Sequence, residues 1–312
     1  MKFNNEAPVI VYGPLRSGTT MIRLMLNGHP LLSVIGESDF IFDHVHSQEN
    51  SWKYDFRSLN ADRIYQDSPI RINNNLDGSA AAMDMVDQIG RHSGGVPVLM
   101  LHRHLSICAH LLPDLRVIRL LRDPRDVARS SIGMGWAGNL YHGLDPWLET
   151  EQSWRTFANN HPNVPKHVLR YEDLVTEPER ELEKICTFLG ITYDSNMLSY
   201  PSHTTYSAPD PKLAFQWKKK LNKYDIQLVE TRAGNFWDGC GYERSGIPLL
   251  HLGPVSRKRL WLQSKAAVWR HLFQRHGVIA PVTRGIGRRL GWGKLEYAAA
   301  NRISKNDRRH LK

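Results

Sequence analysis

Short apolar runs alternate with segments of helical spacing through most of the chain. The runs PVIVY (8–12), VPVLML (96–101) and LRVIRLL (115–121) are brief and apolar enough to be buried strands, whereas 21–27 repeats apolar residues at helical intervals. This alternation predicts an α/β fold, a three-layer sandwich in which helices cover both faces of a central, mostly parallel sheet. With 312 residues, the chain is long enough to bury a sizeable core in one main domain.

The loop GPLRSGTT (13–20) joins the first predicted strand to the first predicted helix. Gly13 and Gly18 bracket a tight turn, and a helix that begins there directs backbone N–H groups and its positive dipole end at an anion. The spacing is that of a Walker A loop, but Thr19 holds the lysine position and the basic residue is Arg16. Because a triphosphate needs that lysine, the loop is better suited to a shorter phosphate ester.

The sequence GPLRSGTT resembles the 5′-phosphosulfate loop of sulfotransferases that use 3′-phosphoadenosine-5′-phosphosulfate (PAPS). Two further stretches, 115–131 and 168–191, match the family pattern in the same order. The resemblance is closest to the branch that contains tyrosyl-protein, carbohydrate and many bacterial sulfotransferases. It implies a fold like that of P-loop nucleotide hydrolases, PAPS as the donor co-substrate, and a reaction that needs no metal.

The resemblance also assigns residues to the donor. In the family an arginine at a strand end and a serine eight residues later bind the 3′-phosphate, and these positions are Arg122 and Ser130 here. Arginine offers a planar pair of donors to a phosphate, and serine adds a hydroxyl donor. The other candidates for donor binding are Arg16, Ser17, Gly18, Thr19, Thr20, Tyr171, Trp217 and Lys218.

Some of these residues have equally ordinary structural interpretations. Trp217 either stacks on the adenine or packs a lid, and the lysine run 218–220 either binds the nucleotide or forms a solvated face. Tyr171 either lies near the nucleotide or anchors the core. Arg125, Asp126 and Arg129 are expected to form surface pairs along the helix that follows Arg122.

Two residues compete for the role of catalytic base. Glu37 follows the His-Pro pair at 29–30, as a glutamate does in the family branch named above, and a carboxylate there can take the proton of an acceptor hydroxyl. The alternative is His104, because VPVLMLHRHL resembles the Lys-Thr-His-Leu segment of cytosolic sulfotransferases, although His102 replaces the lysine. In the implied in-line displacement, Arg16 neutralises charge on the oxygen that leaves sulfur.

The sequence does not identify the acceptor of the sulfuryl group. The first expectation is a hydroxyl of a carbohydrate or glycolipid, and a tyrosyl peptide, a lipid and a small alcohol are the alternatives. Two alternatives to a sulfotransferase are a nucleotide kinase of the P-loop class and a module that binds polyanions or membranes through its tail. The kinase lacks support because neither a Walker lysine nor magnesium ligands are evident. No specific nucleic acid is expected as a partner.

Positive charge is concentrated at the end of the chain. Residues 251–312 contain 15 Lys and Arg against 2 Asp and Glu, whereas the whole chain contains 41 and 31. This contrast predicts a sulfotransferase domain over 1–250 and a basic helical tail over 251–312. The segment 256–276 has helical spacing and can lie on an anionic membrane, bind an acidic glycan or pack on its own domain. The Gly- and Arg-rich remainder from Val278 is expected to be partly disordered until bound.

The location in the cell is predicted as cytoplasmic, with peripheral membrane association through the tail as an option. The first apolar run is too short to span a bilayer. Cys108, Cys186 and Cys240 are an odd number without metal-ligand spacing, each in an apolar context. They are therefore expected to be reduced thiols in the core.

Overall fold

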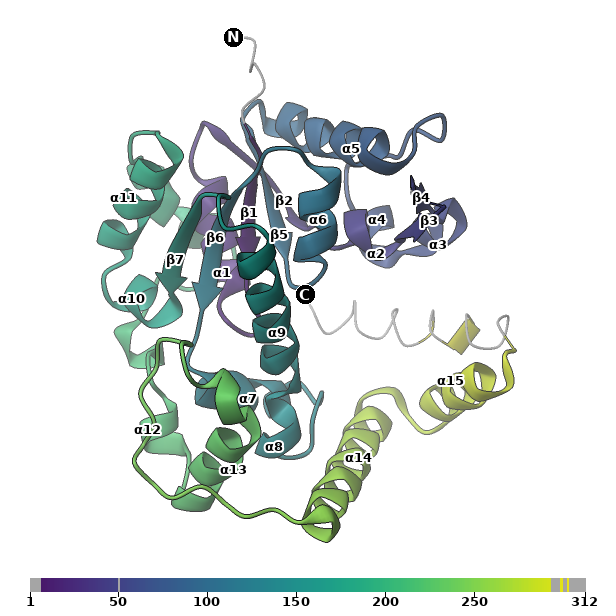
Figure 1. Cartoon of the computed structure of the whole chain (residues 1–312), viewed down its shortest axis with the longest axis vertical. Coiled ribbons are helices and arrows are strands. Elements are labelled where there is room, and N and C mark those ends of the chain that lie inside the picture. Colours follow the sequence, from purple (N-terminus) through teal and green to yellow (C-terminus); the bar gives the residue numbers. More distant parts are fainter. Residues whose placement is uncertain (1–6, 50, 293–297, 300–301, 303–312) are drawn as a thin grey trace. The chain divides into compact units, whose positions relative to one another are not determined.

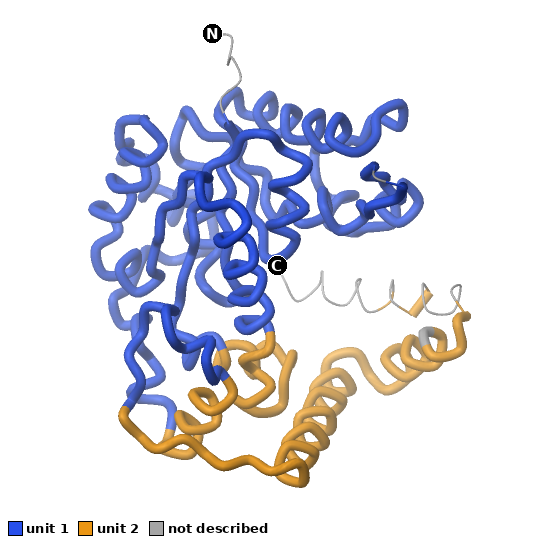
Figure 2. Tube along the Cα trace, in the orientation of Figure 1, with its two compact units in different colours: residues 1–127, 146–221, 233–245 blue, residues 128–145, 222–232, 246–312 orange. Residues whose placement is uncertain are grey.

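The computed structural model describes residues 7–49, 51–292, 298–299 and 302. The chain divides into two compact units, shown in Figure 2. Unit 1 comprises residues 1–127, 146–221 and 233–245, and unit 2 comprises 128–145, 222–232 and 246–312. Unit 2 thus combines the start of the predicted tail with two segments from earlier in the chain, and the proposed domain boundary at residue 250 stays a prediction.

Unit 1 is built on a five-stranded sheet in the order β2–β5–β1–β6–β7 (Figure 1). Every neighbouring pair in this sheet is parallel. The strands are β1 (Val9–Tyr12), β2 (Leu32–Glu37), β5 (Val96–Leu101), β6 (Arg116–Leu121) and β7 (Lys166–Arg170). All four residues of β1 are fully buried, as expected for the middle strand of a sheet that is covered on both faces.

Alternate residues of the strands enter two separate hydrophobic clusters. Ile10 and Tyr12 of β1 pack with side chains of α5 (Gly78–Ser93), α6 (Leu105–Leu111) and α9 (Asp145–Asn160). Val9 and Val11 point the other way and pack with α1 (Thr19–Asn27) and α11 (Pro178–Leu189). The predicted three-layer α/β sandwich is therefore confirmed.

Shorter elements complete unit 1. The hairpin of β3 (Val45–Gln48) and β4 (Ser51–Tyr54) is antiparallel. The remaining short helices of this unit are α2 (Phe40–Asp43), α3 (Phe56–Ala61), α4 (Arg63–Asp67), α10 (Tyr171–Thr176) and α12 (Trp217–Lys220), with 3₁₀ turns at Ser195–Leu198, Tyr200–Ser202, Pro211–Leu213 and Gly234–Phe236. Cys108, Cys186 and Cys240 are buried free thiols, as expected from the sequence.

The strand order places the end of β1 at a topological switch point. The chain leaves β1 for β2 on one side, whereas β6 pairs with the other edge of β1. Because connections on the two sides diverge, a crevice opens at the carboxyl ends of the strands, where ligands bind in open α/β sheets. The loop 13–18 lies at this position.

Unit 2 is helical over its described residues. Its elements are α8 (Leu140–Gly143), α13 (Lys223–Ala233), α14 (Pro254–His276) and α15 (Ile279–Leu290), and α7 (Pro124–Gly133) runs across the division between the units. Residues 279–290 of the Gly- and Arg-rich remainder form α15, and the expectation that this remainder is partly disordered until bound stays a prediction. The tail residues 293–297, 300–301 and 303–312 lie outside the described part of the chain. Among the described helices, none has the length and apolar character that crossing a bilayer requires.

Candidate active site

The loop 13–18 has little space for any residue larger than glycine at its two ends. A Cβ atom at Gly13 would lie 2.5 Å from the carbonyl oxygen of Leu120, and one at Gly18 would lie 2.3 Å from the Tyr171 ring. Gly18 also has a φ of 88°, in the left-handed region. The two glycines therefore hold the loop tightly against β6 and Tyr171.

Helix α1 begins directly after this turn without a side-chain cap and without an acidic residue in its first turn. Its first N–H groups are therefore available to an anion, and the helix dipole favours negative charge at this end. The hydroxyl of Ser17 is completely buried, and its oxygen has no hydrogen-bond partner among the described residues. A buried hydroxyl without a partner fits a loop that holds an anionic ligand.

Two arginines meet beside the loop. The Nη1 atom of Arg122 donates a hydrogen bond to the carbonyl oxygen of Arg16 at 2.8 Å. Burial, followed by the positive charge of Arg122, lowers the pKa of Arg16. Two adjacent guanidinium groups repel each other, so an anion bound between loop and strand end would relieve that repulsion.

Tyr171 packs against both parts of this cluster. The guanidinium carbon of Arg122 lies 4.1 Å from the centroid of the Tyr171 ring, a cation–π contact. Burial raises the pKa of Tyr171, which keeps its hydroxyl protonated. The other predicted partner of the 3′-phosphate, Ser130, lies on α7 among residues that belong to unit 2. Its contact with the nucleotide stays a prediction.

The acidic residue after Tyr171 has a structural role that the sequence did not reveal. Glu172 is buried, and its carboxylate accepts the backbone N–H of Asp123 at 3.0 Å and the hydroxyl of Tyr242 at 2.6 Å. Burial raises the pKa of Glu172. This carboxylate braces the turn that directly follows Arg122.

The position of Arg125, which follows this turn, differs from the surface position that the sequence predicted. Arg125 is not a surface residue: it is 3% exposed and forms an ion pair with Asp123, whose Oδ2 lies 2.7 Å from Nη2. Asp126 is fully buried as well. The guanidinium of Arg125 covers the ring of Trp217 at 3.5 Å, so the ring has a packing partner within unit 1. Lys218 lies over the Phe215 ring at 4.9 Å, and nucleotide binding by Trp217 and Lys218 stays a prediction.

Glu37 and the phosphate loop border the same cavity. This cavity has a volume of about 370 Å³ and is lined by Thr19 and Thr20 of α1 and by Glu37 at the end of β2. Its wall also includes Arg23, Arg63, His102 and Tyr206, which the sequence did not single out for this site. Within the described residues, the Glu37 carboxylate has no hydrogen bond or ion pair, so it is available to an acceptor.

Of the two histidines near the end of β5, the structure places His102 in this cavity. Its Nδ1 lies 2.9 Å from the carbonyl oxygen of Gly13, and its backbone N–H donates to Asp39 at 2.9 Å. A carbonyl oxygen can only accept, so Nδ1 carries the proton and Nε2 of the neutral ring has a free lone pair. Nε2 is buried and has no hydrogen-bond partner in the part of the chain that the structure describes.

His104, the sequence candidate, has a different environment. Its Nε2 lies 3.0 Å from Oδ1 of Asp43, and Asp43 also forms an ion pair with Arg103. The backbone at His104 is left-handed, with a φ of 61°. His104 is absent from the residues that line the cavity of Glu37.

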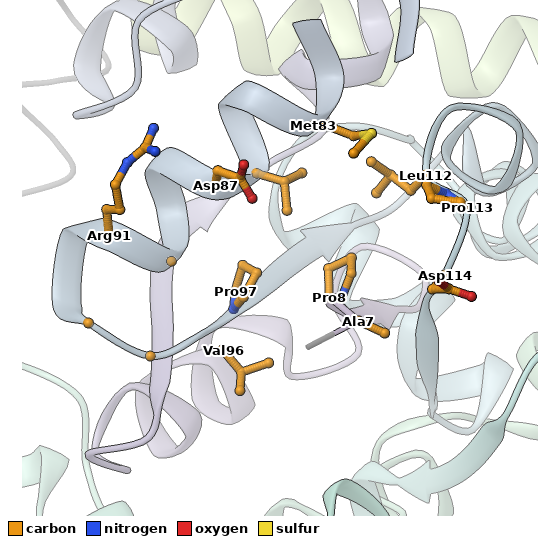
Figure 3. Close-up of a pocket in the computed structure, with 14 residues that line it drawn as sticks. Ala7, Pro8, Met83, Asp87, Arg91, Val96, Pro97, Leu112, Pro113 and Asp114 are labelled. Atoms are coloured by element: carbon orange, nitrogen blue, oxygen red, sulfur yellow. The ribbon is translucent and has the colours of Figure 1, made fainter. Parts of the chain in front are cut away.

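A second, larger cavity of unit 1 lies at the amino-terminal ends of the strands β1 and β5. It has a volume of about 630 Å³ and borders residues at or just before the start of β1 and β5, among them Ala7, Pro8, Val96 and Pro97 (Figure 3). It contains none of the predicted site residues. Cavity size alone therefore does not locate the chemistry, whereas the strand ends do.

The model of the sulfotransferase family matches residues 8–195. The chain belongs to the sulfotransferase family. The match confirms the resemblance stated from the loop and strand ends, and with it a sulfotransferase enzyme. It covers the phosphate loop, Glu37, Arg122 and Tyr171.

Similar proteins include several protein-tyrosine sulfotransferases. Over 210 residues, the chain is 26% identical to a putative protein-tyrosine sulfotransferase of Caenorhabditis briggsae. The aligned region covers 64% of this chain and 71% of the relative. It is 25% identical to protein-tyrosine sulfotransferase 2 of Gallus gallus, and the alignment covers 64% of this chain and 55% of that relative. It is also 25% identical to the protein-tyrosine sulfotransferase of Drosophila melanogaster, where the alignment covers 64% of this chain and 41% of the relative. The chain thus spans about half the length of several curated relatives.

A solved structure supports the fold. The sulfotransferase domain of the Synechococcus PCC 7002 olefin synthase superposes with a TM-score of 0.53 at 21% identity, covering 75% of this chain and 98% of that domain. The architecture of the sheet and its flanking helices is therefore that of sulfotransferases.

Proposed function

We propose that this sulfotransferase moves the sulfuryl group of PAPS to the phenolic oxygen of a tyrosyl residue. The observation that carries the proposal is the shared cavity of the phosphate loop and Glu37, because donor and acceptor must meet where a phosphate cradle adjoins a proton acceptor. The acceptor class rests on the relatives, which are named protein-tyrosine sulfotransferases. The carbohydrate or glycolipid acceptor expected from the sequence stays a prediction.

The donor site combines the loop amides with the two arginines. The N–H groups at the start of α1 and the hydroxyls of Ser17, Thr19 and Thr20 would hold the 5′-phosphate, and Arg122 would hold the 3′-phosphate. PAPS supplies an activated sulfuryl group on a good leaving phosphate. Arg16 faces the charge that develops on that phosphate, and one preorganised donor of this kind is typically worth on the order of 3 kcal/mol in the transition state.

Proton removal is assigned to Glu37. An acceptor hydroxyl becomes a competent nucleophile when its proton is taken as the new bond to oxygen forms, and the Glu37 carboxylate borders the cavity without a competing partner. His102 lines the same cavity and is assigned to position the acceptor hydroxyl.

The test is sulfate transfer from labelled PAPS to a panel of matched acceptors. A tyrosyl peptide, the same peptide with phenylalanine in place of tyrosine, an oligosaccharide and a simple alcohol would be compared with the full chain. We expect label in the tyrosyl peptide and none in the phenylalanine control. Transfer to the oligosaccharide alone would reject the tyrosyl acceptor but keep the sulfotransferase, and transfer to none of them would count against the proposed reaction with these acceptor classes.

A further inference from the structure

The described part of the tail is strongly and uniformly basic. Residues 251–292 contain nine Lys and Arg and no Asp or Glu. This segment forms α14 and α15, which pack against each other: a Cβ atom at Gly285 of α15 would lie 3.5 Å from the Trp269 ring of α14. The positive charge is therefore displayed on ordered helices.

One face of α14 is fixed within unit 2. The backbone N–H of Gly138 donates to the Ser264 hydroxyl at 3.0 Å, and the Asn139 side chain donates to the carbonyl oxygen of Leu260 at 2.7 Å. A Cβ atom at Gly138 would lie 2.4 Å from that of Ala267, so the helix approaches this segment closely. Leu260, Ser264 and Ala267 therefore mark the packed face, as the packing interpretation of the sequence expected.

A different face of α14 is exposed among the described residues and carries cations and apolar side chains in alternation. Lys258, Leu262, Lys265 and Trp269 follow one another at helical spacing and are all exposed. Trp261 is 47% exposed, and the Lys265 ammonium lies 5.9 Å from its ring centroid.

The neighbouring helix continues the pattern of exposed apolar side chains. On α15, Ile286 and Leu290 are exposed, and Trp292, two residues after the end of the helix, is 58% exposed. Arg284 and Arg289 are exposed beside them. Such a concentration of exposed tryptophan and branched aliphatic residues is unusual for a surface that only faces water.

We propose that this surface of α14 and α15 binds the interface of an anionic lipid bilayer. Lysine and arginine are attracted to anionic headgroups, while tryptophan and leucine gain free energy only where an apolar phase adjoins them. A glycan or nucleic acid would satisfy the charges and could stack on a tryptophan, but it would leave Leu262, Ile286 and Leu290 in water. A lipid interface satisfies both, and the helices lie on it without spanning it. The inference is independent of the proposed acceptor and of the donor site.

The test is co-sedimentation of the full chain with vesicles of phosphatidylcholine alone or with phosphatidylserine added. We expect binding to the anionic vesicles, weakened by salt because Debye screening shortens the reach of the charges. The double variant Lys258→Glu/Lys265→Glu should weaken binding at least about tenfold. The matched control Arg57→Glu/Arg91→Glu makes the same charge change at exposed positions of unit 1 and should change the affinity less than about twofold.

A second variant separates lipid from other polyanions. Trp261→Ser/Trp292→Ser keeps every charge and should weaken vesicle binding several-fold while binding to heparin stays the same, because only the lipid offers an apolar phase. Circular dichroism would show that each variant is folded. Equal binding of this variant and the unmodified chain to vesicles would overturn the proposal, as would equal affinity for neutral and anionic vesicles.

Discussion

Single residues decide the chemistry at the end of β2 and β5. The sequence placed Glu37 and His104 near the strand ends, and the structure brings Glu37 to the cavity of the phosphate loop. His102 lines that cavity, and its Nδ1 contacts the carbonyl oxygen of Gly13. His104 instead pairs with Asp43. The resemblance selected His104, because the contact of His102 with Gly13 and the pairing of His104 with Asp43 arise from tertiary packing that the local sequence does not contain.

The role of Glu37 is tested by Glu37→Gln, which keeps the shape of the side chain and removes its basicity. We expect turnover of the acceptor to fall by roughly a hundredfold or more, while the affinity for 3′-phosphoadenosine-5′-phosphate changes little. The control is His104→Ala, which removes a residue outside the cavity and should retain most of the turnover. An active Glu37→Gln enzyme together with an inactive His104→Ala enzyme would reverse the assignment.

At the scale of elements, the loop 13–18 depends on contacts that adjoining elements supply. Gly18→Ala places a methyl group against the Tyr171 ring at a position with positive φ. We expect a loss of more than about 2 kcal/mol in the free energy of unfolding, since both backbone strain and steric overlap oppose the change. Donor binding should be lost in the same variant because the loop must move. Chemical denaturation and calorimetry would measure the two effects.

Gly190→Ala is the matched control for this change. Gly190 ends α11 with a φ of 73°, but no atom of the other described residues lies within 4 Å of a Cβ atom built there. The control should therefore show only the cost of a left-handed alanine, about 1 kcal/mol, and unchanged donor binding. Equal losses in the two variants would show that the close approach of Tyr171 has no energetic importance.

Packing between elements explains why the expectation of a surface position for Arg125 was wrong. Arg125 follows a pattern typical of a solvated helix start, yet Asp123 and Trp217 bury it, and Trp217 is distant in the sequence. In unit 2, α15 packs against α14 next to Trp269, and Gly291 ends α15 in the left-handed conformation. Local sequence does not contain such long-range contacts.

At the scale of the whole molecule, periodicity predicted the fold class because the strands are buried on both faces and therefore read as continuous apolar runs. The order β2–β5–β1–β6–β7 then follows from pairings that no local pattern encodes. The family resemblance supplied the predicted donor-site residues of unit 1, which lie in short loops after strands, and their contacts with a nucleotide stay predictions. The composition of unit 2 was not predictable, because it joins 128–145 and 222–232 to the tail.

The central claim is that the loop and Arg122 form a site for a nucleotide with both a 5′- and a 3′-phosphate. Calorimetry of 3′-phosphoadenosine-5′-phosphate and of adenosine 5′-phosphate, with the unmodified chain and with Arg122→Ala, tests it most directly. We predict that the 3′-phosphate improves binding by roughly ten- to a hundredfold in the unmodified chain and much less in Arg122→Ala, because a charge-assisted contact is lost. Equal affinities of the unmodified chain for the two nucleotides would contradict the account.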